Sequence, residues 1–106
     1  MTGSGSEPQA RGGDLLGPVV SRYVTISNQR GLHARAAARF VKLAAEFNAE
    51  ILVLKNGVAV SGLSIMGLMM LAAGIGSTVE LRAEGPDAQA ALDALIALVE
   101  RKFDEA

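Results

Sequence analysis

The stretch EILVLKNGVAVSG, residues 50–62, constrains the fold more than any other part of the chain. Its aliphatic and β-branched runs flank the dipeptide Asn56-Gly57. Both of these residues tolerate the positive φ angles of a two-residue type I′ turn, which joins neighbouring strands that run antiparallel. The stretch therefore predicts a β-hairpin in the middle of the chain.

Strand-like and helix-like patterns alternate around this hairpin. RYVTIS (22–27) and TVELRAE (78–84) alternate apolar and polar residues, with the period of two that is typical of half-buried strands. Residues 34–47 and the stretch from 88 to about 103 repeat apolar side chains every three or four positions, which predicts amphipathic helices. A shorter helix is predicted in IMGLMMLA (65–72). The order β-α-β-β-α-β-α predicts an α+β open-faced β-sandwich, with a four-stranded antiparallel sheet and three helices on one face.

The length of the chain allows one domain. Half of its 106 residues are apolar, which is enough for a single core. Residues 1–19 are rich in glycine, serine and charge and have no apolar periodicity. We therefore expect a flexible N-terminal tail at 1–19 and a single domain at 20–106.

Composition argues against several classes of function. Ten basic and eleven acidic residues give a net charge of -1, and only four residues are aromatic, so a nucleic-acid partner is not expected. The chain has no cysteine and one histidine, which argues against a metal site, and no sequence feature points to a cofactor. The longest apolar run, residues 63–76, is too short for a membrane span and contains glycines. We expect a soluble, cytoplasmic, monomeric protein without a membrane partner.

The single histidine, His33, lies in RGLHARAAARFV, where a turn enters the first predicted helix. This makes His33 a candidate N-cap residue. The unpaired amides and positive dipole of a helix N-terminus bind anions, so a phosphoryl group on the imidazole would be stabilised there. Arg35 could add a guanidinium to the phosphoryl oxygens. A lone histidine is nevertheless more often an ordinary surface residue, and the spacing alone does not decide between the two.

The wider sequence resembles one family. GLHAR, FVKLAAEFNAEI, NGVAV and LSIMGLMMLAAG occur in an order and spacing similar to the HPr family, the histidine-containing phosphocarrier proteins of the phosphoenolpyruvate:sugar phosphotransferase system, from about Tyr23 onwards. The resemblance implies that His33 accepts a phosphoryl group on Nδ1 from phosphorylated enzyme I and passes it to A components of the pathway. It also implies that Arg35 stabilises the phosphoryl group. The family usually has proline where this chain has Ala36.

Ser64 precedes the short second helix and matches the serine that a kinase/phosphorylase modifies in part of the family. The simpler interpretation is an N-cap, and both can hold. The resemblance implies that Ile65, Met66 and Met69 form an exposed docking patch. Leu68 and Leu71 are instead expected to be buried.

Other functions remain open at this point. The chain has no paired carboxylates and no nucleotide-binding loop, so a carrier that depends on partner enzymes is expected, and not an autonomous enzyme. A non-catalytic regulatory protein-interaction module of the same fold is the alternative, and such a module would not need His33. The family also has a nitrogen-related regulatory branch beside sugar uptake. Ala36 and the segment IALVERKFDEA (96–106) favour that branch.

Overall fold

The computed structural model describes residues 17–105, which fold into one sheet and one layer of helices. The elements in chain order are β1 (Val19–Thr25), α1 (Ala34–Ala44), β2 (Glu50–Lys55), β3 (Val58–Ser61), α2 (Ile65–Met70), β4 (Thr78–Glu84), α3 (Ala88–Glu100) and the short 3-10 turn η2 (Lys102–Asp104). The order confirms the predicted fold class. The tail predicted for residues 1–19 lies mostly outside the described residues, and β1 begins at Val19.

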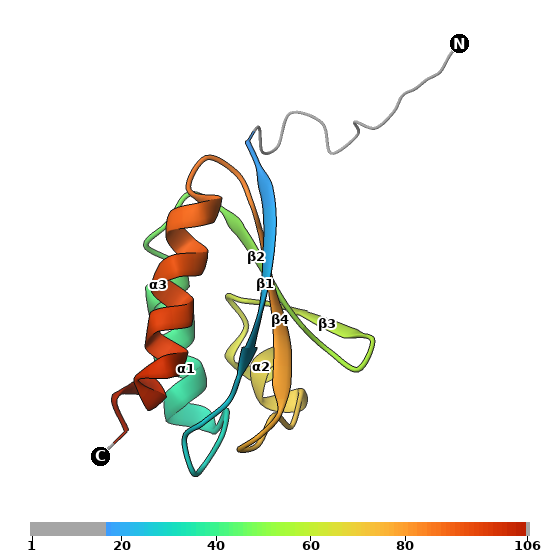
Figure 1. Cartoon of the computed structure of the whole chain (residues 1–106), viewed down its shortest axis with the longest axis vertical. Coiled ribbons are helices and arrows are strands. Elements are labelled where there is room, and N and C mark those ends of the chain that lie inside the picture. The colour runs from blue at the N-terminus through green and yellow to red at the C-terminus, as the bar shows by residue number, and fades with distance from the viewer. Residues whose placement is uncertain (1–16, 106) are drawn as a thin grey trace.

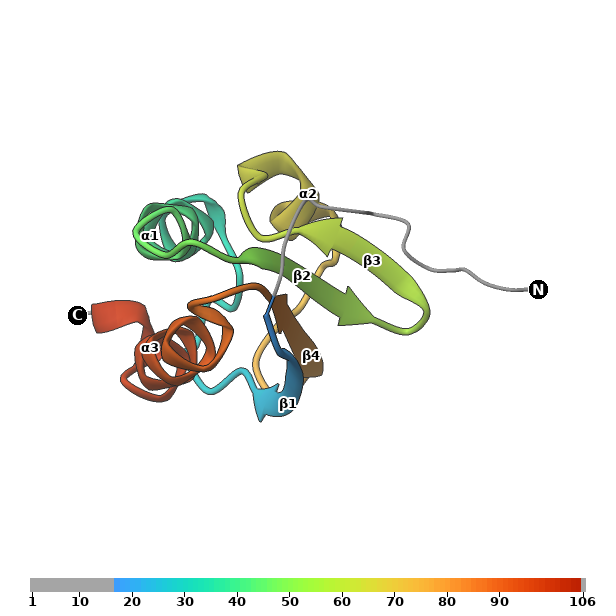
Figure 2. The same ribbon diagram turned by 90° about the horizontal axis from the view of Figure 1, so that it is seen from above.

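The four strands pair antiparallel in the order β1-β4-β2-β3. Val24 is paired with Val79 across β1 and β4, and Val53 with Leu81 across β2 and β4. These pairs alternate with polar or exposed residues along each strand, so one face of the sheet is apolar. Figure 2 shows all three helices on the same side of the sheet.

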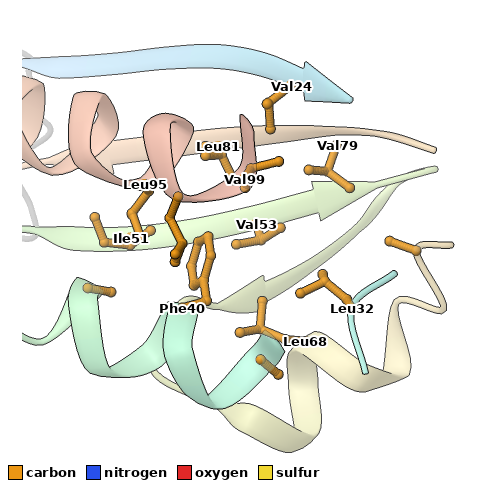
Figure 3. Close-up of a cluster of buried hydrophobic side chains, with 14 of the residues drawn as sticks. Val24, Leu32, Phe40, Ile51, Val53, Leu68, Val79, Leu81, Leu95 and Val99 are labelled. Carbon is orange, nitrogen blue, oxygen red and sulfur yellow. The ribbon is translucent and has the colours of Figure 1, made fainter. Parts of the chain in front are cut away.

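The core lies between the apolar face of the sheet and the helices. Phe40 from α1 and Leu95 from α3 meet Val53 and Leu81 of the sheet, and all four are almost completely buried (Figure 3). Leu68 of α2 is fully buried in the same cluster (Figure 3). The helical spacing of the apolar residues therefore places them on the helix faces that pack into one continuous core.

The hairpin and the strand patterns are confirmed, whereas all three predicted helices end earlier than expected. Asn56 and Gly57 have φ angles of 51° and 82°, as a type I′ turn requires. The first helix ends at Ala44 and not at residue 47. The amides of Glu46 and Phe47 donate to carbonyls three residues earlier, and not four residues earlier as in an α-helix. The short helix predicted in residues 65–72 ends at Met70, and Ala72 has a left-handed φ of 53°.

The last helix ends at Glu100 instead of continuing to about residue 103. The next residues cannot extend it, since Lys102, Phe103 and Asp104 have φ angles of 60°, 56° and 57°. A left-handed backbone is incompatible with a right-handed α-helix. The apolar periodicity of the sequence continues to Phe103 because this side chain is also buried in the core. Its backbone, however, is left-handed and not helical.

The loop before α1 is fixed against the segment after α2. Gly31 has a φ of +66°, and a Cβ atom there would lie 2.5 Å from the carbonyl oxygen of Ala73. The Leu32 amide donates to that same oxygen at 2.9 Å. Only glycine permits both the positive φ and this close approach. The contact fixes where the chain enters α1 (Figure 1).

None of the helices formed by residues 17–105 combines the length and the apolar character that a bilayer crossing needs.

Candidate functional site

His33 is the N-cap residue of α1, as predicted. Its backbone is extended, with φ -78° and ψ 179°, and its side chain makes no capping hydrogen bond to the helix. The amides of Ala34, Arg35 and Ala36 belong to the first turn, where intrahelical acceptors are lacking. Ala36 does not disturb the helix start, and it keeps a backbone N–H that a proline would lack.

The imidazole of His33 is held by a carboxylate from the other end of the domain. Nε2 of His33 lies 3.0 Å from Oε1 of Glu105, and both side chains are mostly buried. Nδ2 of the buried Asn28 donates to the same oxygen at 2.8 Å and to the Gly31 carbonyl at 2.8 Å. Glu105 is thereby tied both to the imidazole and to the loop that precedes α1.

The contact with Glu105 determines which ring nitrogen is free. An ionised carboxylate offers only acceptor sites, so the hydrogen bond requires the proton on Nε2. A neutral imidazole carries one ring proton, which leaves Nδ1 of His33 with its lone pair available. The arrangement resembles the way in which a buried carboxylate fixes the tautomer of a catalytic histidine.

Hydrogen bonding keeps Glu105 ionised. The side-chain hydrogen bond from Asn28, followed by that from His33, lowers the pKa of the Glu105 carboxyl below its ordinary value of 4.5. The backbone of Arg30 also donates to the carboxylate, while desolvation acts in the opposite direction. Glu105 is therefore an acceptor for the imidazole at neutral pH.

A cavity of about 230 Å³ opens beside the imidazole. Its lining consists of Arg30, His33, Arg35, Ala36, Arg39, Phe103, Asp104 and Glu105. Three of these residues carry guanidinium groups, which suit a phosphate because they offer planar pairs of donors. The structure brings Arg35 to the same cavity as His33, as predicted, with Arg30 and Arg39 in addition. Within residues 17–105, no three potential metal ligands of the His, Cys, Asp or Glu type come together.

Ser64 and its neighbours form a second group of predicted residues, on α2. Oγ of Ser64 accepts from the Gly67 amide at 2.9 Å, which confirms the N-cap. Ile65, Met66 and Met69 are exposed, whereas Leu68 and Leu71 are buried, as predicted. The exposed apolar side chains of this part of the chain also include Leu63, Met70 and Ile75. Since α2 packs against α1, this apolar surface lies on the element next to the helix that His33 caps (Figure 2).

Sequence reasoning missed Glu105, Asn28 and Arg39. Glu105 is 72 positions from His33 along the chain, and nothing in its local sequence marks it. Asn28 reads as an ordinary turn residue, although it is buried and orients the carboxylate. Arg39 reads as one of several basic residues on an exposed helix face.

We expect Glu105→Gln to change how stability depends on pH. A carboxyl whose pKa is lowered by folding stabilises the native state above its unfolded pKa and loses that contribution as the pH falls through the folded pKa. Urea unfolding of the parent should therefore weaken below about pH 4.5 more steeply than that of Glu105→Gln. Glu46→Gln, a change of an exposed carboxyl outside the cavity, is the matched control. Equal slopes for the parent and Glu105→Gln would show that folding does not stabilise the Glu105 anion.

Comparison with known proteins identifies the family of this chain. A family model described as the PTS HPr component phosphorylation site matches residues 20–101. The phosphocarrier protein HPr of Cupriavidus necator is 52% identical over 87 residues, which are 82% of this chain and 98% of the relative. The phosphocarrier protein NPr of Shewanella violacea is also 52% identical over 87 residues, covering 82% of this chain and 96% of the relative.

Solved structures give the same result. The HPr structure from Thermoanaerobacter tengcongensis aligns with a TM-score of 0.78 at 44% identity, covering 82% of this chain and 98% of that one. The HPr structure from Bacillus anthracis aligns with a TM-score of 0.74 at 47% identity, covering 76% and 96%. In sequence and in fold, the chain belongs to the HPr family of phosphocarrier proteins of the phosphotransferase system.

Proposed function

We propose that His33 accepts a phosphoryl group on Nδ1 from phosphorylated enzyme I and passes it to A components of the phosphotransferase system in the cytoplasm. The observation that carries the proposal is the hydrogen bond between Nε2 of His33 and Glu105. It leaves Nδ1 as the ring atom with a free lone pair, at a helix N-terminus suited to an anion. The proposal assumes no cofactor, no metal and a monomeric carrier.

In the forward step, the lone pair of Nδ1 attacks the phosphorus atom, and the bond between phosphorus and its donor on enzyme I breaks. A neutral imidazole needs no general base for this attack. Nε2 keeps its proton, so the ring gains positive charge as the nitrogen–phosphorus bond forms. The Glu105 carboxylate, 3.0 Å from Nε2, offsets that charge.

The transferred group would be held by donors from two sources. First-turn amides of α1 point from the helix N-terminus, where the dipole favours negative charge. The Arg35 guanidinium lines the cavity next to His33 and can pair with phosphoryl oxygens. In the return step, an acceptor group on the A component attacks phosphorus, and the electron pair returns to Nδ1.

A direct labelling experiment tests this proposal. Incubation with enzyme I and labelled phosphoenolpyruvate should place one acid-labile, base-stable phosphoryl group on His33, as expected of a phosphoramidate. His33→Gln should take up no label, because its amide nitrogen is not a nucleophile. Glu46→Gln, away from the cavity, should label like the parent. If His33→Gln is labelled as fully as the parent, the carrier proposal is wrong.

The same experiment separates the carrier from a regulatory interaction module. A module that acts only by binding would remain unlabelled, and its binding would survive His33→Gln. The phosphocarrier protein HPr of Cupriavidus necator and the phosphocarrier protein NPr of Shewanella violacea are equally similar to this chain, at 52% identity, so the comparison does not favour one branch. The proposal therefore concerns transfer through His33 and is common to both branches.

We further propose that an ATP-dependent kinase modifies Ser64 and thereby weakens docking of partners. The side chain is half-buried at the N-terminus of α2, next to the exposed Ile65 and Met66. A phosphate adds nearly two negative charges beside apolar side chains that must be desolvated when a partner binds. The helix N-terminus tolerates an anion, so the fold should persist.

Ser64→Asp should slow phosphoryl transfer from enzyme I to His33 without abolishing it, because aspartate carries less charge than phosphoserine. Ser64→Ala is the matched control: it should lose roughly 1 kcal/mol of stability with the cap to Gly67 but retain the transfer rate. Stopped-flow transfer assays and urea unfolding measure the two effects. Unchanged kinetics for Ser64→Asp and for authentic phosphoserine would leave Ser64 as a cap only.

A further inference from the structure

The C-terminal turn that carries Glu105 has an unusual backbone. Lys102, Phe103 and Asp104 are consecutive residues with φ angles of 60°, 56° and 57°, and none of them is glycine. L-residues rarely adopt this left-handed conformation, because Cβ crowds the following carbonyl oxygen. Such a turn persists only where surrounding contacts hold it, and clusters of this kind are found at functional sites.

Contacts on both sides hold the turn. The Phe103 side chain is buried in the core, and the Glu105 amide donates to the Lys102 carbonyl at 2.9 Å. The guanidinium of Arg39, which is half-buried on α1, donates to the Phe103 carbonyl. This is the hydrogen bond that ties the backbone of the turn to the helix capped by His33.

The turn determines where Glu105 lies. Glu105 directly follows the left-handed residues, and its carboxylate reaches Nε2 of His33 at 3.0 Å. If the Phe103 carbonyl were released, the turn could relax to right-handed or extended backbone, and the carboxylate would move away. The imidazole would then lose the acceptor that keeps its proton on Nε2.

We propose that Arg39 is a positioning residue for phosphoryl transfer, which acts through the Phe103 carbonyl on Glu105 and so fixes the tautomer of His33. The proposal rests on the proposed transfer at Nδ1. Arg39 also lines the cavity, so it could instead contact the phosphoryl group directly. The experiment must distinguish these two routes.

The tautomer can be measured without any partner. Ring 15N shifts of His33 at about pH 8.5, where an ordinary imidazole is neutral, report which nitrogen carries the proton. The parent should have the proton on Nε2, and Arg39→Gln should shift the population towards Nδ1. Lys42→Gln removes a charge from the exposed face of the same helix and should leave the parent spectrum unchanged. An unchanged tautomer in Arg39→Gln would overturn the proposal.

A rescue experiment tests the route through the turn. Glycine adopts positive φ without steric cost, so Lys102→Gly should restore the Nε2 tautomer in the Arg39→Gln background. Loss of a direct contact with the phosphoryl group could not be restored in this way. Failure of the rescue in a folded double variant would show that Arg39 does not act through the turn. Thermal melts of each variant confirm folding.

Transfer kinetics complete the test. Arg39→Gln should lower kcat/KM for transfer from enzyme I by about 10-fold, as is common when a group that orients a reactive histidine is removed. In a Glu105→Gln background, the same change should have no further effect. A full additional loss there would mean that Arg39 acts on the phosphoryl group and would overturn the proposed route. If the parent accepts no label at His33, the transfer proposal fails, whereas the tautomer measurements still decide the role of Arg39.

Discussion

The hydrogen bond between Nε2 of His33 and Glu105 joins the beginning and the end of the domain. It depends on three parts of the fold at once: the loop fixed at Gly31, the N-terminus of α1 and the left-handed turn after α3. Asn28 links two of these parts, since its side-chain amide donates both to the Gly31 carbonyl and to the Glu105 carboxylate. The reactivity proposed for the imidazole is therefore a property of the whole domain and not of the short motif around it.

Charge is distributed in a way that the net charge of -1 conceals. Arg30, Arg35 and Arg39 line one cavity, so the local field at His33 favours an anion although the chain as a whole is slightly acidic. Asp104 and Glu105 are the carboxylates that line the same cavity, and hydrogen bonds keep Glu105 ionised. In the proposed transfer, a phosphoryl group on His33 would meet the Arg35 guanidinium, while the Glu105 carboxylate stabilises the imidazole that bears it.

Much of the fold could be predicted because it depends on local patterns. The Asn56-Gly57 turn, the N-cap at Ser64 and the buried or exposed positions along α2 all follow from residues close together in sequence. The position of His33 at the start of α1 could be predicted for the same reason. The end of α3 could not, because the apolar spacing continues through Phe103 while the backbone becomes left-handed at Lys102.

The partners of His33 depend on tertiary structure alone. Glu105 reaches the site through a left-handed turn that contains no glycine, Arg39 contacts the backbone of that turn from α1, and Asn28 is distinguished only by its burial. The motif therefore predicts the residue that we propose to be reactive, whereas the groups that contact it are brought there by packing of distant chain segments.

The central claim is that the hydrogen bond to Glu105 keeps the proton of His33 on Nε2, so that Nδ1 is the nitrogen that bonds to phosphorus. Nuclear magnetic resonance of 15N-labelled protein phosphorylated by enzyme I tests this most directly, because coupling between 31P and 15N identifies the bonded nitrogen. The account predicts coupling at Nδ1, with Nε2 still protonated. Coupling at Nε2 would contradict it.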